Sequence, residues 1–330
     1  MASVSVVMAV HNGSRFLEEA VESILNQTLR DFEFIIINDG SSDGSGQILE
    51  MYSSMDKRIR LFHQDKQGLT KSLNTGIQLS SAELIARMDA DDVSAPKRLQ
   101  TQVEYLSNHS DVVCLGAQAL KIDNDGDPLF PWNVPLEHDE IVDELLCGTG
   151  GQIIHPLFLV RREALKKVGG YNEKYLYAQD YDLLLRLADI GLLANLPEVL
   201  LSYRIHCSGA TFAKRKEQQI YALIACLNAH DRRSTPVSDI AISYLACPDV
   251  QIISHAELAN KALNAGYIKS AEKHALKALP NFRPFSIDWL QMKKLSNVNP
   301  VKMIFYCAIA PAYRRAQDCR YYIRRFGLSK

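Results

Sequence analysis

The sequence predicts an α/β fold: a mostly parallel sheet flanked by helices, followed by a helical C-terminal extension. Over residues 1–90, short β-branched runs alternate with amphipathic helical patterns, which is typical of βαβ units. A polar cluster follows three of these runs. The composition, 47% hydrophobic and 23% charged, is that of a folded chain with a sizeable core.

The first ninety residues predict strands and helices in strict alternation. Apolar residues stand at helical spacing in Arg15–Asn26, whereas Val4–Ala9 is a β-branched run typical of a buried strand. The predicted strands are Val4–Ala9, Phe32–Ile37, Ile59–His63 and Leu84–Met88, and the predicted helices are Arg15–Asn26, Gly46–Met55 and a segment marked by Leu69, Leu73 and Ile77. Right-handed crossovers place the carboxyl ends of these strands at one edge, where α/β sheets bind ligands.

After residue 95 the alternation changes. We expect a helix over Pro96–Ser107 with Ser94 as its N-cap. The next predicted elements are a strand at Val112–Ala117, a turn-rich stretch at Asp123–Trp132, a helix at Glu137–Cys147, a strand at Ile153–Val160, a helix at Arg161–Val168, a helix from Asp180 and a strand at Val199–His206. Beyond Ala213 only helices are predicted, among them one that a capping box at Ser254 opens and Gly266 ends.

Charge and cysteine usage bound the setting of the chain. Residues 1–206 hold 18 basic and 30 acidic residues, a net −12, whereas residues 207–330 hold 19 and 8, a net +11. This asymmetry predicts two regions with different partners. Seven cysteines without a C-x-x-C pair favour a reduced, cytoplasmic setting without structural zinc. We expect neither a signal peptide nor a membrane-spanning run.

Three polar clusters follow predicted strands: "VHNG", "NDGSSDGS" and "DADD". Since parallel strands end at the same edge, we expect the clusters to converge there. Isolated, "NDGSSDGS" would be a turn and helix cap, although Asp39 at the strand end could accept hydrogen bonds from a nucleobase or ribose. No G-x-G-x-x-G and no P-loop is present, which disfavours a nicotinamide enzyme and a P-loop NTPase.

The acidic cluster places Asp89, Asp91 and Asp92 within four positions. A divalent cation, Mg²⁺ or Mn²⁺, would let these carboxylates coexist and would neutralise a diphosphate leaving group. The alternative is a solvated loop in which Asp92 or Ser94 caps the next helix. The expected convergence at the sheet edge favours the metal.

Six motifs occur in the order seen in family-two glycosyltransferases: "VSVVMAVHNG", "FEFIIINDGSSDGS", "GLTKSLNTGI", "LIARMDADD", "GGYNEKYLYAQDYDLLLRL" and "YRIH". On residues 3 to about 208 the chain resembles this inverting, GT-A-fold family. The resemblance implies a hexosyltransferase-type enzyme with a GT-A domain over 1–212, whose halves are a nucleotide-binding part, 1–95, and an acceptor part, 96–212. A helical, basic region, 213–330, would follow.

The same resemblance implies roles for individual residues. Val10, His11 and Asn12 would line the nucleoside pocket, with Asp39 contacting the nucleobase. Asp89 would contact ribose or the metal shell. Asp91 would bind the metal directly, and His206 resembles a third metal ligand of some relatives, although a lone histidine at a strand end is more often structural.

Asp180 resembles the catalytic base, which an acceptor hydroxyl needs in order to become a good nucleophile. Gln179 stands where the family has glutamate. The alternative for Asp180 is a carboxylate at a helix start, and Asp182 with Arg186 suits an ordinary i,i+4 pair. His155 is either acceptor-side or core.

The C-terminal residues 293–330 contain nine basic residues and one acidic residue, Asp318. Such a segment fits peripheral contact with the anionic inner face of a membrane, or a helix packed on the acidic region. We expect no nucleic-acid binding, because no recognised module accompanies the charge.

The leading hypothesis is transfer of a sugar, from a UDP-sugar or another nucleotide-sugar, to a glycan or lipid-linked glycan. The resemblance implies a role in surface polysaccharide or lipopolysaccharide assembly. The alternatives are a sugar-nucleotide nucleotidyltransferase and a non-catalytic nucleotide-sugar-binding module.

Overall fold

The computed structural model describes residues 2–148, 150–206 and 215–235, and short pieces at 261–262, 264–267, 269–270 and 273–274. The chain divides into two compact units. One comprises residues 1–124 with 131–250, and the other 125–130 with 251–330. The boundary expected after residue 212 stays a prediction.

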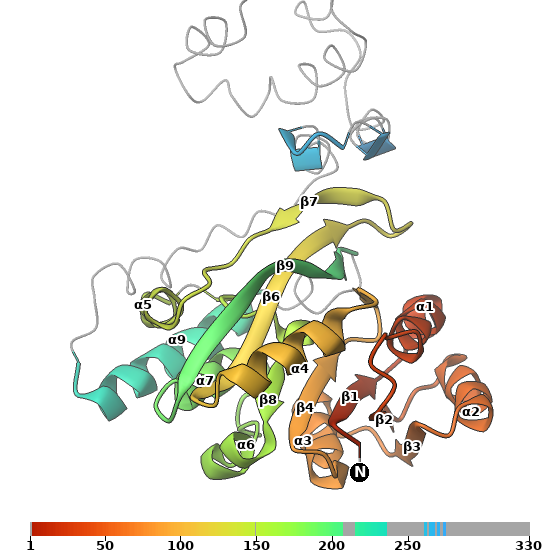
Figure 1. The fold of residues 1–330 in the computed structure, drawn as a ribbon, viewed down its shortest axis with the longest axis horizontal. Coiled ribbons are helices and arrows are strands. Elements are labelled where there is room, and N and C mark those ends of the chain that lie inside the picture. The colour runs from red at the N-terminus through yellow and green to blue at the C-terminus, as the bar shows by residue number, and fades with distance from the viewer. Residues whose placement is uncertain are drawn as a thin grey trace, which may run out of the picture. The chain divides into compact units, whose positions relative to one another are not determined.

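The first half of the sheet follows the predicted alternation closely (Figure 1). Its strands are β1 (Val4–Val10), β2 (Phe32–Asp39), β3 (Ile59–Gln64) and β4 (Leu84–Met88), and its helices are α1 (Ser14–Leu25), α2 (Ser45–Met55) and α3 (Leu69–Leu79). The four strands are parallel in the order β3-β2-β1-β4, with Val4 opposite Phe32 on one side and Leu84 on the other. Their carboxyl ends therefore share one edge of the sheet.

The second half extends this sheet beyond β4 in the order β8-β6-β9-β5. β8 is antiparallel to β4 and β6, β6 is parallel to β9, and β5 is antiparallel to β9. The elements are β5 (Val93–Ser94), α4 (Arg98–Asn108), β6 (Val112–Ile122), β7 (Pro128–Trp132), α5 (His138–Leu146), the 3-10 turn η1 (His155–Leu157), β8 (Leu159–Arg161), α6 (Arg162–Val168), α7 (Gln179–Leu187), β9 (Leu192–Arg204) and α9 (Arg215–Arg233).

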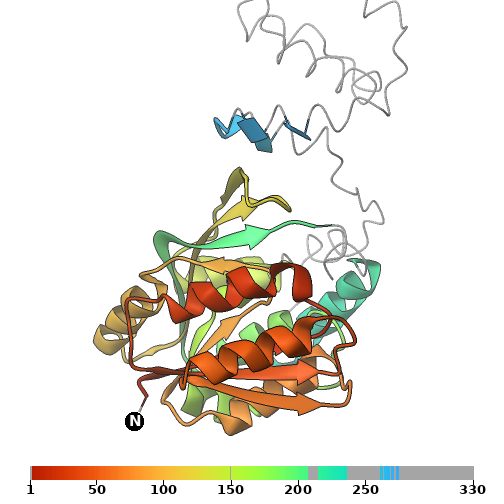
Figure 2. The same cartoon turned by 90° about the vertical axis from the view of Figure 1, so that its right-hand side faces the viewer.

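Two apolar cores cover the two faces of the sheet. Successive strand residues point to opposite faces, so Val6 and Met8 of β1 pack with Leu17 of α1 and Leu99 of α4, whereas Val7 packs with the helices of the other face. Figure 2 shows α1 and α2 lying along the same side of the sheet. The opposite core draws on α3, α5, α6, α7 and α9. The loops at the carboxyl edge therefore extend from a sheet that is packed by apolar cores on both faces.

Two expectations for the second half were wrong, and a third was incomplete. Ser94 does not cap a helix: it lies in β5 and pairs with Leu201 of β9, and a turn at residues 96–97 separates it from α4, which begins at Arg98. The strand expected at Ile153–Val160 is broken by η1, because Pro156 has no N–H to give to a sheet ladder. The turn-rich stretch Asp123–Trp132 has its turn at residues 124–125 and continues as strand β7.

The described pieces beyond residue 260 agree with a helix that ends near Asn264. Residues 261–262 and 264 are helical, and Gly266 adopts a φ of 85°, the left-handed conformation that ends helices. The predicted helix start at Ser254 and the basic segment 293–330 lie outside the described residues. Within the described part of the chain, none of the helices has the length and apolar character needed to cross a membrane.

Candidate active site

The loops that follow β1, β2 and β4 lie against one another at the carboxyl edge of the sheet. The Nδ1 atom of His11 lies 2.8 Å from the main-chain oxygen of Asp39. The loop after β1 also touches the acidic loop, since a Cβ placed on Gly13 would lie 3.5 Å from the Cβ of Ala90. The expected convergence of three polar clusters is therefore confirmed.

The loop after β1 is held in an unusual backbone conformation by the loop after β2. Asn12 has a φ of 54°, in the left-handed region that asparagine tolerates better than most residues. Its N–H donates to the Ser41 hydroxyl at 3.1 Å, and its side-chain oxygen accepts the N–H of Ser42 at 2.8 Å. Val10 is buried in the core beneath. The exposed side chains here are those of His11 and Asn12.

Asp39 is buried at the end of β2 and is held by the chain that follows β3. One carboxylate oxygen accepts from the Gln64 amide at 2.7 Å and from the N–H of Gln67 at 2.8 Å, and the other accepts the N–H of Gly68 at 2.8 Å. Burial alone would raise the pKa of Asp39, but these hydrogen bonds outweigh it and lower the pKa. Asp39 is therefore ionised, and its carboxylate is largely enclosed by the chain at the end of β3 and beyond.

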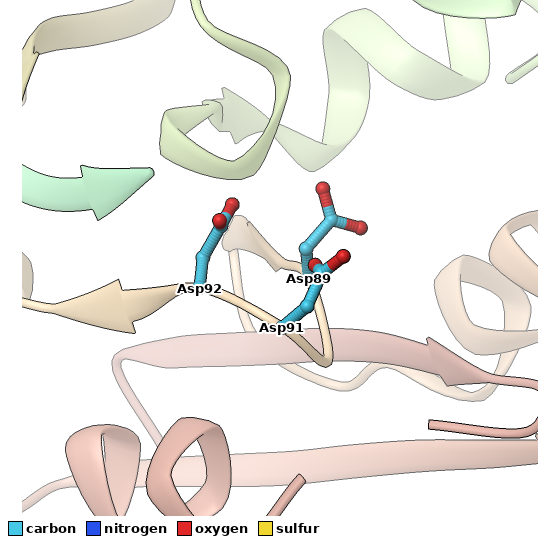
Figure 3. A group of neighbouring side chains, drawn as sticks. All are labelled: Asp89, Asp91 and Asp92. Atoms are coloured by element: carbon cyan, nitrogen blue, oxygen red, sulfur yellow. The ribbon is translucent and has the colours of Figure 1, made fainter. Parts of the chain in front are cut away.

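The acidic loop after β4 brings the carboxylates of Asp89, Asp91 and Asp92 within 4.8 Å of one another. Figure 3 shows all three side chains projecting toward the same side of the loop. Each has a different partner. Asp89 pairs with the buried Arg87, Asp91 lies 2.8 Å from the Nε2 atom of His206, and Asp92 accepts the N–H of Arg204 at 2.8 Å.

These partners do not fully offset the burial of the three carboxylates and the repulsion among them. Burial raises the pKa of Asp89, and the charges of Asp91 and Asp180 raise it further, although Arg87 opposes them. Burial, followed by the charges of Asp91 and Asp89, raises the pKa of Asp92 well above its ordinary value. Within the described part of the chain, the Oδ2 atom of Asp92 is buried without a hydrogen-bond partner.

The donor set at this loop fits a divalent cation. It offers several carboxylate oxygens and one imidazole nitrogen from His206, ligand types that Mg²⁺ and Mn²⁺ accept. The orphaned oxygen of Asp92 and the raised carboxylate pKa values both indicate negative charge in need of a cation. Asp92 does not cap the next helix, as the alternative had it, because that helix begins only at Arg98.

Asp180 lies in the first turn of α7, after a left-handed residue, Ala178, with a φ of 53°. Burial raises the pKa of Asp180, while the N–H of Tyr181 and the charge of Arg87 oppose the rise. Because the charge of Asp180 also raises the pKa of Asp89, the two carboxylates share one electrostatic environment. A carboxylate with a raised pKa is suited to accept a proton near neutral pH.

The neighbouring candidates are structural. The carboxylate of Asp182 binds the Arg186 guanidinium at 2.6 Å, which confirms the i,i+4 pair. The Nε2 atom of His155 lies 2.6 Å from the Tyr171 hydroxyl. Burial, and then the charge of Arg87, lower the pKa of His155 well below its usual range, so this half-buried ring is neutral.

The structure also contains two site residues to which the sequence patterns gave no role, Arg87 and Arg204. Both are buried arginines, 5% and 4% exposed, and both contact the acidic loop. Each stands at the end of an apolar strand, where a charged side chain is unusual. An arginine at the end of an apolar strand was therefore the feature of the sequence that could have identified both residues.

Comparison with solved structures defines the class of protein. The structure of S. aureus TarS 1-349 in complex with UDP aligns with a TM-score of 0.57 at 15% identity, covering 97% of this chain and 93% of that one. The mannosyltransferase PcManGT from Pyrobaculum calidifontis, in complex with GDP-Man and Mn²⁺, aligns with a TM-score of 0.56 at 17% identity, covering 96% and 88%. The fold is therefore the GT-A glycosyltransferase fold.

Sequence comparison then places the chain in a family. Residues 5–169 match the profile described as Glycosyl transferase family 2. The O-antigen biosynthesis glycosyltransferase WbnJ of Escherichia coli is 33% identical over 207 residues, which cover 62% of this chain and 80% of WbnJ. The chain belongs to glycosyl transferase family 2, and the protein is a glycosyltransferase.

Proposed function

We propose that this glycosyltransferase moves a sugar from a nucleotide-sugar to an acceptor hydroxyl in one displacement with inversion, and that Asp180 is the base. The observation that carries the proposal is the convergence of the loops after β1, β2 and β4, where the carboxylates of Asp89, Asp91 and Asp92 lie within 4.8 Å of one another. The charge of Asp180 acts on Asp89 in this cluster. A single displacement needs one base on the face opposite the leaving group. The raised pKa of Asp180 supports that role.

The proposed reaction is a single displacement at the anomeric carbon of the donor sugar. Asp180 takes the proton of the acceptor hydroxyl, while the hydroxyl oxygen forms a bond to the anomeric carbon. The bond between that carbon and the diphosphate oxygen breaks, and the nucleoside diphosphate leaves with the electron pair. Asp180 ends the step protonated and returns its proton to solvent.

Asp91 and His206 would hold a divalent cation, Mn²⁺ or Mg²⁺, with Asp89 contacting it or the ribose. The 2.8 Å contact between Asp91 and His206 supports this pairing. The Mn²⁺ in the PcManGT complex supports use of a metal on this fold. When bound, the ion neutralises the diphosphate of the departing nucleotide.

The nucleoside would lie over the loops after β1 and β2. His11 and Asn12 present exposed side chains there, Val10 supports them from the core, and the ionised Asp39 at the end of β2 is the proposed partner of the base. The UDP of the TarS complex supports a uridine nucleotide, and the GDP-Man of PcManGT is the alternative to be tested.

The proposed setting is assembly of cell-surface polysaccharide or lipopolysaccharide, with a glycan or lipid-linked glycan as acceptor. The name of WbnJ, an O-antigen biosynthesis glycosyltransferase, supports this setting. We further propose a cytoplasmic location with peripheral contact at the inner membrane face. Flotation of the full chain with vesicles of anionic and of neutral lipid tests the contact: binding to neither would exclude it.

Product analysis tests the reaction. The full chain is incubated with radiolabelled UDP-sugars and GDP-sugars, Mn²⁺ and a glycan acceptor mixture. We expect free UDP or GDP and a labelled glycan of inverted anomeric configuration. Release of pyrophosphate would instead identify a nucleotidyltransferase, and nucleotide-sugar binding without turnover would identify a binding module. The Asp180→Asn variant is the matched negative control.

A further inference from the structure

Arg204, the last residue of β9, connects the acidic loop to two other segments. Its Nε–H donates to the main-chain oxygen of Asp91 at 2.9 Å, and its own backbone N–H donates to the Asp92 carboxylate at 2.8 Å. Its Nη1 group donates to the main-chain oxygens of Asp123 and Asn124 at 3.1 and 3.2 Å. One side chain thus fixes the acidic loop against the end of β6.

The outer end of the guanidinium reaches α1. Its Nη2 group pairs with the Glu19 carboxylate at 2.5 Å, and its Cζ atom lies 4.6 Å above the centre of the Phe16 ring. The same Phe16 ring lies 5.2 Å from the ring of His206. Arg204 therefore contacts groups that hold both proposed metal ligands in place. It binds the main-chain oxygen of Asp91, and it packs on Phe16, whose ring lies beside that of His206.

The environment of Arg204 is not one that maximises stability. Its side chain is 1% exposed, whereas that of its partner Glu19 is 55% exposed. Burying a guanidinium is costly, and a partner that remains in water repays little of that cost. The other N–H groups serve main-chain carbonyls. The fixed fork of donors suits arginine to hold several carbonyls at once, whereas the point charge of lysine cannot reach them together.

We propose that Arg204 is a positioning residue that sets the orientation of Asp91 and His206 toward the divalent cation. The proposal rests on the metal-dependent function proposed above. It assigns Arg204 no contact with substrate or with the ion. The backbone supports the same arrangement, since the N–H of Ile205 pairs with the main-chain oxygen of Ile122 and fixes the chain just before His206.

The test is the affinity of the full chain for Mn²⁺, measured by electron paramagnetic resonance with and without UDP. We expect Arg204→Lys to raise the Kd for Mn²⁺ about tenfold or more, the scale seen when an outer partner of a ligand is lost. UDP binding without metal should change less than about twofold, because the loops after β1 and β2 do not depend on this side chain.

Arg161→Lys is the matched control. The Arg161 guanidinium also donates to three main-chain oxygens, those of Leu106, His109 and Val112, at 2.8 to 2.9 Å. It lies in β8, away from the acidic loop, so its loss should leave the Kd for Mn²⁺ at the wild-type value. Circular dichroism checks folding. Should Arg204→Lys not fold, Glu19→Gln loosens the same side chain from its outer end and should weaken Mn²⁺ binding by a smaller factor.

The outcomes distinguish failure of the positioning role of Arg204 from failure of the proposed metal-dependent function. A wild-type chain that binds Mn²⁺, together with folded Arg204→Lys and Glu19→Gln variants of unchanged Kd, would overturn the positioning role and leave the metal-dependent function standing. A wild-type chain that binds no Mn²⁺ with UDP present would overturn both. Asp91→Asn, which removes the proposed ligand itself, marks the size of a complete loss.

Discussion

The Nε2 atom of His206 lies 2.8 Å from the Oδ2 atom of Asp91, although 115 positions separate the two residues. The contact joins the chain beyond β9 to the loop after β4. Carboxylate oxygen and imidazole nitrogen are both ligands for first-row divalent ions. The pair is therefore the proposed site of the nucleotide-bound metal.

Substitution of His206 tests this pair. We expect His206→Ala to raise the Kd for Mn²⁺ by more than about tenfold, since loss of even an outer partner weakens metal sites by that factor. The fold should persist, because the ring is at the edge of the core. Isothermal titration with Mn²⁺ in the presence of UDP measures the change. An unchanged Kd would make His206 structural, as lone histidines at strand ends often are.

Substitution of Asp180 tests the base. We expect Asp180→Asn to lower kcat about 100- to 10,000-fold, the usual contribution of general base catalysis. The Kd for UDP should stay at the wild-type value, because the proposed role of Asp180 is toward the acceptor hydroxyl and not toward the nucleotide. Steady-state kinetics and titration with UDP separate the two effects. A variant that keeps its kcat would refute the assignment.

The raised pKa of Asp180 has a defined consequence for activity. The base acts when ionised, so kcat/KM should fall as the pH is lowered through a pKa above the ordinary 3.8 of aspartate. Gln179→Glu adds a negative charge next to Asp180 and should move this limb to still higher pH. Gln179→Met, which adds no charge, serves as the control. A limb that stays in place in Gln179→Glu would show that Asp180 does not control it.

Much of the fold followed from local patterns because local chemistry decided it. The bounds of β4 are as predicted, and β1 differs by one residue, since each is mainly apolar and is interrupted by a single polar or charged residue, Ser5 or Arg87. Ser94 failed as a cap because its environment is set by pairing with Leu201, more than a hundred positions away. Long-range pairing of this kind leaves no trace in the neighbouring sequence.

The candidate site likewise contains residues whose roles the motifs predict and residues whose roles depend on long-range contacts. Asp91 and Asp180 stand in motifs whose residue types carry their chemistry. Arg204 was part of the "YRIH" motif, but its role depends on main-chain oxygens of distant segments, which have no residue type to recognise. Arg87 shows the same limit, because only the fold brings its charge to both Asp89 and Asp180.

Glu33 of β2 gives a stability test independent of activity. Its carboxylate accepts hydrogen bonds from the Ser5 hydroxyl, the N–H and hydroxyl of Ser81, and Arg60, at 2.5 to 2.7 Å. Burial raises the pKa of Glu33, but these hydrogen bonds lower it from 4.5 to about 2. The folded pKa lies below the unfolded one. The stabilisation is therefore complete above pH 4.5 and is lost as the pH falls toward 2.

Glu33→Gln should lower the free energy of unfolding by about 1–3 kcal/mol at pH 7. The deficit relative to wild type should shrink as the pH is lowered from 5 toward 2. Urea unfolding at a series of pH values measures it. A deficit that is the same at every pH would mean that the charge of Glu33 contributes nothing.

Gly76 tests the packing of α3 on the sheet. A Cβ at this position would lie 2.4 Å from a methyl carbon of Val7 in β1. Gly76→Ala should therefore destabilise the fold by about 1–3 kcal/mol through overpacking, although alanine favours helices. Thermal unfolding measures the loss, with Lys71→Ala on the exposed face of α3 as the control. Equal stability of the two variants would contradict the close approach.

Anomalous diffraction at the manganese edge, from crystals of the full chain with UDP and Mn²⁺, tests the central claim most directly. We expect one manganese peak within ligand distance of the Asp91 carboxylate and the His206 Nε2 atom, with the diphosphate oxygens bound to the same ion. The Asp180 carboxylate should lie in the same site, across the place of the transferred sugar from the diphosphate. A manganese ion or a nucleotide bound away from the acidic loop, with Asp180 in a separate part of the surface, would contradict the account.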